Sequence, residues 1–401
     1  MMEQPPVAPS WPVFTAAQVN AVTEVINSGK VNYWTGPHGR AFEAELAKCF
    51  EVKHAIATAN GTLALELCLF GLGVRPGDEV IVPARTFIAS ASAIVARGAQ
   101  PVVVDVEAES QGLSVRSVEA NITVKTKAVI AVHLGGWPCD IAALQRVCGP
   151  RQISIVEDCA QAHGASIGGK PVGSLGTVAA LSFCQDKIIT TLGEGGAVLT
   201  NDSTLYERMW SYKDHGKNRV ATATSGGNGA NFRWLHESFG TNMRMTEVQA
   251  VVGRHALCAL PGWISRRQEI AAALRSVCQM HNGITVPVPP RNVQPAFYKF
   301  YFFVREEMLG GGWTREKIIE GLRSGGISCG VGSCGEIWRE KAFPQAWRPH
   351  EPLAVAKRLA EESVAISISP NWTESYLGYV CGRLDSVLST ARSGRCCFAA
   401  A

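Results

Sequence analysis

The sequence predicts an α/β protein with a mostly parallel sheet covered by helices, followed by a smaller C-terminal α+β domain. Two observations predict this fold. Short apolar runs rich in β-branched residues alternate with segments of helical spacing through the first half of the chain, and after about Thr200 the pattern changes to longer polar and helical stretches. The chain has 401 residues, of which 46% are hydrophobic, so it is long enough to bury one large core and a smaller one.

The apolar runs in the first half are each short enough to be a strand. We expect strands, in chain order, at Glu79–Pro83, Pro101–Val106, Lys127–His133, Ile153–Asp158 and Ala179–Phe183. Segments with helical spacing lie between them, at Thr62–Leu72, Ile88–Arg97 and Asp140–Val147. Strand and helix therefore alternate, which indicates parallel strands joined by helices that cover both faces of the sheet.

The second half predicts a loop, longer helices and a smaller unit. The Gly- and Asn-rich segment Ser225–Asn231 is expected as a loop, and helices follow at Met245–Leu260 and Pro261–Gln279. The smaller unit begins near Ile284, with a strand at Lys299–Val304 and helices at Thr314–Arg323 and Tyr376–Ala391. We divide the chain into an N-terminal segment (1–30), a large domain (31–260), a small domain (261–395) and a tail (396–401).

The composition argues against several classes of function. The formal charge of +4 comes from 38 basic and 34 acidic residues mixed throughout, so we expect no nucleic-acid partner. Met1–Pro12 lacks the apolar core of a signal peptide, and no apolar run reaches the roughly 20 residues of a membrane helix, so we expect a soluble, cytoplasmic protein with no membrane partner. The 13 cysteines are odd in number and form no CxxC pair, which favours reduced thiols and no metal site.

Asp158 ends an apolar run in the segment VEDCAQAHG, residues 156–164. Ligands of open α/β sheets gather at the carboxyl ends of strands, so an acid at this point is a candidate site residue. One interpretation is that Asp158 caps a helix. The other is that its carboxylate keeps a heteroaromatic nitrogen protonated, as an electron-sink cofactor requires.

Lys187 follows the next apolar run and precedes the glycine-rich turn TTLGEGG, residues 190–196. As an ordinary lysine it would be a solvated surface residue. As a functional residue its amine would be partly desolvated and would form a Schiff base with an aldehyde. The glycines would let the backbone pass close to the ligand.

The turn Asn60-Gly61-Thr62 precedes a helical segment rich in leucine. The unpaired backbone N–H groups of a helix start bind phosphate, although Asn60 or Thr62 could simply cap the helix. Together with Asp158 and Lys187, this turn completes the three features that pyridoxal phosphate needs: a phosphate anchor, a partner for the ring nitrogen and an amine for the aldehyde.

Five separate motifs stand along the chain: NGT (60–62), PGDEVIVP (76–83), EDCAQAHG (157–164), GEGG (193–196) and GTNMRMTEVQA (240–250). With these motifs, in this order, the chain resembles the DegT/DnrJ/EryC1/StrS aminotransferases over almost its entire length. This resemblance implies the type I fold of pyridoxal-phosphate enzymes, like that of aspartate aminotransferase, with a sheet of the seven-stranded type. Leu192 departs from the family, whose members usually carry a small residue there.

The resemblance also implies roles for individual residues. Lys187 would bind the cofactor and then move the proton between substrate and cofactor, and Asp158 would pair with the ring nitrogen. Gln161 and Phe87 would contact the cofactor ring, and Gly61, Thr62 and Ser182 would hold its phosphate. The family also implies a homodimer in which the segment His215–Arg244 reaches the partner subunit, with Asn242 or Arg244 near the phosphate bound there. By spacing alone Phe87 would pass for a core residue, and Asn242 could instead cap the helix near Met245. The family's chemistry does not depend on His163, so we expect it to be a satisfied structural histidine.

Two loops of the family's substrate side have counterparts in this chain, Val31–Pro37 and Tyr298–Tyr301. The implied reaction moves an amino group from L-glutamate, through pyridoxamine phosphate, to a keto sugar attached to a nucleotide. Because related dehydratases carry histidine in place of Lys187, its lysine favours transamination. Two alternatives remain: an acceptor that is a keto-cyclitol or another small ketone, and a non-catalytic regulatory protein with the same fold.

Overall fold

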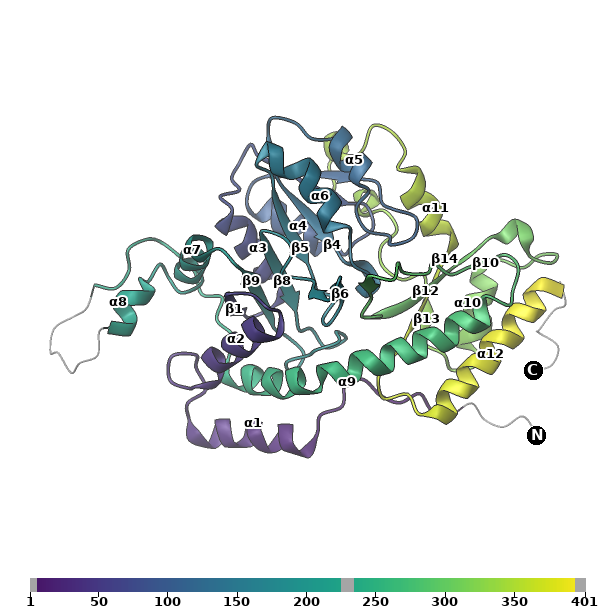
Figure 1. Ribbon diagram of the computed structural model, residues 1–401, viewed down its shortest axis with the longest axis horizontal. Helices are drawn as coiled ribbons and strands as arrows, with labels where there is room; N and C mark the ends of the chain where they lie inside the picture. Colours follow the sequence, from purple (N-terminus) through teal and green to yellow (C-terminus); the bar gives the residue numbers. More distant parts are fainter. Residues whose placement is uncertain (1–5, 225–233, 394–401) are drawn as a thin grey trace.

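A computed structural model describes residues 6–224 and 234–393. Its centre is a seven-stranded sheet with the order β1-β9-β8-β5-β4-β2-β3 (Figure 1). The strands are β1 (His54–Thr58), β2 (Glu79–Pro83), β3 (Gln100–Val104), β4 (Thr126–Val132), β5 (Ser154–Asp158), β8 (Val178–Ser182) and β9 (Gly196–Thr200). All neighbours pair in parallel except β9, which is antiparallel to both β8 and β1. The predicted mostly parallel sheet is confirmed, but β1 and β9 were missed.

Helices cover both faces of this sheet. One face packs against α3 (Gly61–Gly71), α4 (Ala89–Ala96) and α7 (Ser203–Lys213), through buried side chains such as Leu65, Ile94 and Met209. The other face carries α5 (Val115–Ala120) and α6 (Ile141–Cys148), which bury Val118 and Leu144. The helices expected between the strands are therefore present, with each end shifted by one residue.

Helix α9 runs unbroken from Glu247 to Cys278, through Pro261. The prediction of two helices meeting at Pro261 is wrong. An interior proline usually breaks a helix because it removes one hydrogen bond and crowds the preceding turn. Here the helix packs over its length against α2 (His38–Cys49), α1 (Ala16–Ser28) and α12 (Glu374–Ser393), and this tertiary packing outweighs the local cost.

The C-terminal part holds an antiparallel sheet with the order β10-β12-β14-β13. Its strands are β10 (Ile284–Thr285), β12 (Lys299–Val304), β13 (Cys329–Gly330) and β14 (Ser363–Ser367), and α10 (Arg315–Arg323) and α12 share its core. The predicted strand and both predicted helices are confirmed. The predicted domain boundary at 260/261 falls inside α9, which contributes side chains to the cores of both parts. The domain division stays a prediction.

The remaining elements are short or peripheral. They are α8 (Arg219–Thr224), α11 (Ala354–Glu362), the small sheet β11 (Val293–Gln294), β6 (Ser166–Ile167) and β7 (Lys170–Pro171), and the 3-10 turns η1 (Leu134–Gly136), η2 (Gly149–Arg151), η3 (Glu306–Met308), η4 (Ile337–Arg339) and η5 (Gln345–Trp347). Within the described ranges every cysteine is free, as predicted, and none of the helices is long and apolar enough to cross a bilayer. The loop expected at Ser225–Asn231 and the tail from 396 both lie outside the described residues.

Candidate active site

The turn before α3 meets the ends of β8 and β9 at one edge of the sheet. A side chain at Gly61 would bring its Cβ within 2.5 Å of the Cβ of Ser182, and one at Gly196 would lie 2.8 Å from the backbone nitrogen of Gly61. Only glycine fits this close approach. The side chain of Asn60 accepts a hydrogen bond from the Leu63 backbone N–H at 2.9 Å, which confirms it as the helix cap. The structure therefore brings the predicted phosphate residues Gly61 and Ser182 together.

Asp158 lies at the same edge, at the end of β5, and is 6% exposed. Its carboxylate accepts hydrogen bonds from the Ser90 hydroxyl and the Ala160 backbone N–H, both at 3.1 Å. Burial raises the pKa of Asp158 above its ordinary value, opposed by these two hydrogen bonds and by the charge of Lys187. No helix begins after it, since the next element is β6, so the helix-cap interpretation is wrong.

Lys187 follows β8 in the connection to β9, and only 16% of its side chain is exposed. Its Nζ lies 3.6 Å from Asp186 Oδ1 and 5.0 Å from the centroid of the Tyr298 ring. The Trp11 indole N–H donates to the Lys187 carbonyl at 3.0 Å, so the N-terminal segment holds the backbone here. The interpretation of Lys187 as a solvated surface residue is wrong.

Phe87 and Gln161, the residues expected at the cofactor ring, differ in their surroundings. Phe87 is 65% exposed, so it is not a core residue and has a free ring face. The Gln161 side-chain oxygen accepts a hydrogen bond from the Gly135 backbone N–H at 2.7 Å, which fixes the side chain against η1. Both surroundings are compatible with the implied contacts, which stay predictions.

The segment with Asn242 and Arg244 lies beside the phosphate turn of its own subunit, because the Ala59 backbone N–H donates to the Met243 carbonyl at 2.9 Å. Arg244 Nη1 lies 2.8 Å from Asp214 Oδ1, so its guanidinium is already engaged in an ion pair. Asn242 accepts from the Arg244 backbone N–H, and Thr246 caps α9. The interpretation of Asn242 as the helix cap is therefore wrong, and a contact with a partner's phosphate stays a prediction for both residues.

His163 differs from the expectation of a satisfied histidine. The ring is fully buried and stacks on Phe183 at 5.6 Å between centroids, and neither ring nitrogen has a hydrogen-bond partner among the described residues. Burial, with the charges of Lys187 and Arg267, lowers the pKa of His163 to about 3. The imidazole is therefore neutral at physiological pH and adds no positive charge near Lys187.

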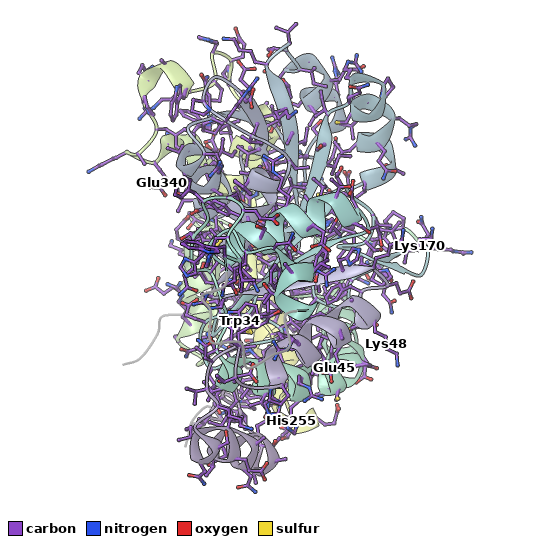
Figure 2. All side chains as sticks on the ribbon, turned by 90° about the vertical axis from the view of Figure 1, so that its left-hand side faces the viewer. Trp34, Glu45, Lys48, Lys170, His255 and Glu340 are labelled. Carbon is purple, nitrogen blue, oxygen red and sulfur yellow. The ribbon has the colours of Figure 1, made fainter. Side chains whose placement is uncertain are left out.

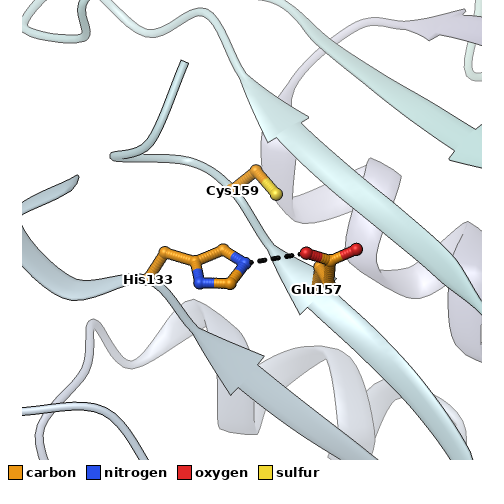
Figure 3. A group of neighbouring side chains, drawn as sticks. All are labelled: His133, Glu157 and Cys159. Carbon is orange, nitrogen blue, oxygen red and sulfur yellow. Dashed lines mark hydrogen bonds and ion pairs between the residues drawn. The ribbon is translucent and has the colours of Figure 1, made fainter. Parts of the chain in front are cut away.

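His133, Glu157 and Cys159 form a buried cluster (Figure 3) that no sequence motif predicts, and their possible ligand atoms lie within 4.8 Å of one another. His133 Nδ1 accepts from the Cys139 backbone N–H, so the other ring nitrogen carries the proton and donates to Glu157 at 3.0 Å. The Glu157 carboxylate also accepts backbone N–H groups of Gly173, Leu175 and Gly176. Burial raises the pKa of Cys159 to about 12, which keeps it a neutral thiol. Because His133 and Glu157 already use their nitrogen and oxygen atoms in hydrogen bonds and Cys159 keeps its proton, the cluster does not fit a metal centre. Its hydrogen bonds hold the loop before β8.

A cavity of about 540 Å³ lies on a different flank, between α2, α7 and α8. Its wall includes Tyr33, Trp34 and Arg219, and Trp34 is labelled on that flank in Figure 2. Neither Lys187 nor Asp158 lines it. Tyr33, from the expected substrate-side loop, is buried and donates a hydrogen bond to Glu43 at 2.9 Å, so it serves the packing of its own subunit.

The sheet order, with a mostly buried lysine and a buried aspartate at one edge, defines the type I fold of pyridoxal-phosphate enzymes. The chain belongs to the DegT/DnrJ/EryC1/StrS aminotransferase family, whose model matches residues 12–385. The aminotransferases of this family depend on pyridoxal phosphate. The protein is thus an enzyme, a transaminase, as predicted.

Three similar proteins illustrate the match. The dTDP-3-amino-3,4,6-trideoxy-alpha-D-glucose transaminase of Streptomyces venezuelae is 36% identical over 88% of this chain and 86% of its own. The GDP-perosamine synthase of Escherichia coli O157:H7 is 38% identical over 67% of this chain and 73% of its own. A crystal structure of an aminotransferase from Psychrobacter cryohalolentis is 42% identical, with a TM-score of 0.93 over 96% of this chain and 100% of that one.

Proposed function

We propose that this aminotransferase uses pyridoxal phosphate to move an amino group from an amino acid, L-glutamate, to a keto sugar linked to a nucleotide. The observation that carries this proposal is the pair of Lys187 and Asp158 at one edge of the sheet. The lysine amine is largely withdrawn from solvent, and the buried carboxylate has no ion-pair partner within 4.0 Å among the described residues. A buried carboxylate without a counter-ion is costly, and a protonated ring nitrogen would compensate it.

The residues present fit the cofactor. Gly61 and Ser182 form a cradle that a side chain at Gly61 would fill, at the positive end of the α3 dipole, where a phosphate is stabilised. Asn60 shapes that turn as the helix cap, Thr62 lies in the first helical turn, and the exposed ring of Phe87 offers a face for stacking. When bound, pyridoxal phosphate supplies an aldehyde that captures amines and a ring that accepts the electron pair released at the substrate carbon.

The chain's own groups would then do three things. Lys187 would hold the cofactor through its amine and, once displaced, carry the proton to and from the substrate carbon. Asp158 would keep the ring nitrogen protonated through a charge-assisted hydrogen bond, while Ser90 orients the carboxylate at 3.1 Å. The neutral His163 would leave the electrostatic balance between Lys187 and Asp158 undisturbed.

The acceptor class rests on the relatives. One is named as a transaminase of a dTDP-linked amino sugar and the other as a synthase of a GDP-linked one. Because the two differ in nucleotide, they support a nucleotide-linked keto sugar as the class of acceptor and leave the base and the sugar open. An acceptor such as a keto-cyclitol would use the same two catalytic residues and differ only in loop contacts.

The active enzyme is proposed to be a homodimer that shares residues across its interface. The segment from His215 to Arg244 carries large exposed apolar side chains, of which Trp234 is 89% and Phe239 101% exposed. Its helix α8 stands away from the body of the molecule in Figure 1. Exposed apolar groups of this size mark interaction surfaces. A cytoplasmic location and the absence of metal, nucleic-acid and membrane partners stay predictions.

The test is a half-reaction with glutamate and no sugar acceptor. Protein reconstituted with pyridoxal phosphate should release about one equivalent of 2-oxoglutarate per active site. Lys187→Ala should release almost none, whereas Lys125→Ala, which removes an exposed lysine, should match the wild type. Wild-type protein that releases no keto acid would favour the regulatory alternative. A panel of keto sugars and keto-cyclitols, added to the aminated form, then identifies the acceptor.

A further inference from the structure

The amine of Lys187 lies in a small cluster with the side chains of Asp186 and Tyr298. Asp186 Oδ1 is 3.6 Å from Lys187 Nζ, and the Tyr298 hydroxyl donates a short hydrogen bond to the other carboxylate oxygen. The Tyr298 ring lies under the amine, with its centroid 5.0 Å from Nζ, in the geometry of a cation–π contact. The Asp186 carboxylate therefore links Lys187, in the connection between β8 and β9, to Tyr298, which immediately precedes β12.

Tyr298 is held firmly enough to act as a fixed point. It is 6% exposed. Its neighbour Phe297 and the more distant Ile368 offer their carbonyl groups to Arg267 Nη1, at 3.2 and 2.8 Å. A Cβ at Gly136 would lie 3.0 Å from the Tyr298 backbone nitrogen, so the chain packs directly on η1. The phenol thus has little freedom to leave Asp186.

The charges of the cluster are consistent with this geometry. Partial burial by itself raises the pKa of Asp186, but the charge of Lys187 and the hydrogen bond from Tyr298 lower it below its ordinary value. Burial and Asp186 raise the pKa of Tyr298, so the phenol keeps its proton and remains a donor. Asp186 is therefore a carboxylate held by a neutral donor on one side and facing an amine on the other.

We propose that Asp186 and Tyr298 are positioning residues for Lys187, which hold its amine at the small-domain side of the site whenever the amine is not bonded to cofactor. This inference rests on the proposed function of Lys187. Asp186 and Tyr298 would bind the free amine while it is not bonded to the cofactor. The displaced lysine would then stay close to the substrate carbon to which it carries the proton.

The proposal is tested on the full-length chain freed of cofactor, by reductive methylation with formaldehyde and a borane. Mass spectrometry of peptides gives the rate at Lys187 relative to the exposed Lys125. An amine held against a carboxylate reacts more slowly than a free one, so Asp186→Asn should speed labelling of Lys187 about two- to fivefold. Tyr298→Phe, which keeps the ring and the carboxylate, should give a smaller increase.

Two controls separate positioning from general loosening. Asp186→Glu restores the carboxylate and should return labelling close to the wild-type rate. Asp385→Asn is a matched control, since Asp385 is similarly exposed (49% against 61%) and pairs with His281 in another part of the chain; it should leave Lys187 unchanged. An Asp186→Asn protein that labels Lys187 at the wild-type rate, or no faster than Asp385→Asn, overturns the proposal. Because no cofactor is present, that result is independent of whether the glutamate half-reaction succeeds.

Discussion

Glu157 and Asp158 are neighbouring carboxylates on β5 whose side chains point to opposite faces of the sheet. Glu157, fully buried, accepts from His133 and from the backbone N–H groups of Gly173, Leu175 and Gly176, which uses its acceptor capacity of about four lone pairs. Asp158 accepts only from Ser90 and Ala160 among the described residues. A buried acid whose acceptor sites are all used stabilises the fold, whereas one with unused acceptor sites is available to a ligand.

The largest expected effect separates the two acids by activity. Asp158→Asn should lower the rate of the glutamate half-reaction about 100- to 1000-fold, because the ring nitrogen loses its charged partner. Cofactor binding should persist. Asp105→Asn, a matched change at a residue that follows β3 and accepts from the Val355 and Ala356 backbone N–H groups, should keep most of the rate. Near-normal turnover of Asp158→Asn would remove Asp158 from its proposed role.

The second effect separates them by stability. Glu157→Gln should lower the free energy of unfolding by about 3 kcal/mol, because it removes buried hydrogen bonds to the carboxylate and places an amide N–H₂ against backbone donors. Asp158→Asn should change it by less than about 1 kcal/mol. Urea unfolding of both variants measures the difference. Equal losses would show that the two acids do the same structural work.

The acids also predict opposite responses to pH. Although burial alone raises the pKa of Glu157, His133 and the backbone donors lower it below its ordinary value of 4.5. Its contribution to stability is therefore complete above 4.5 and is lost as the pH falls through the lower folded-state value, so the deficit of Glu157→Gln should narrow in acid. The pKa of Asp158 is raised above its ordinary value of 3.8, so its ionised form costs stability at neutral pH; that cost begins to shrink as the pH falls through the raised value and is gone below 3.8. Urea unfolding from neutral to acidic pH should show both trends, and a Glu157→Gln deficit that widens in acid would contradict them.

The smallest expected effect comes from backbone strain at Leu192, near the proposed cofactor site. Leu192, in the glycine-rich turn after Lys187, has a φ of 61° and is 44% exposed. A left-handed conformation costs a residue with a side chain about 1–2 kcal/mol, and replacing it with glycine removes that cost. Glycine also loses more conformational entropy on folding, which cancels part of the stabilisation. Leu192→Gly should therefore raise the free energy of unfolding by about 0.5–1 kcal/mol. A loss of stability in thermal unfolding would mean that contacts of the leucine outweigh the strain.

The fold was predictable where strands are rich in β-branched or aromatic residues, as at Glu79–Pro83 and Lys299–Val304, whose bounds match β2 and β12. It was not predictable at β1 and β9, whose sequences HAIAT and GAVLT mix alanine and glycine with few β-branched residues and take their strand form from pairing with each other. The predicted helix break at Pro261 was wrong for a related reason: packing against other helices, not the local sequence, decides that α9 continues through the proline.

The site divides in the same way. Lys187, Asp158 and the turn at Gly61 were predictable because strand ends and a helix start place such groups at one edge of the sheet. The networks around Glu157 and Tyr298 join segments far apart in the chain, 24 residues for His133 and 112 for Asp186, and nothing in local spacing announces them. The buried His163 ring, whose nitrogens have no hydrogen-bond partner among the described residues, is likewise a property of packing.

The central claim is that Lys187 is the lysine that carries the cofactor. The most direct measurement is borohydride reduction of the protein reconstituted with pyridoxal phosphate, followed by mass spectrometry of its peptides. The account predicts that the added mass lies on Lys187 and is absent from the buried Lys213 and from Lys299. An adduct on another lysine, or none at all, would contradict it.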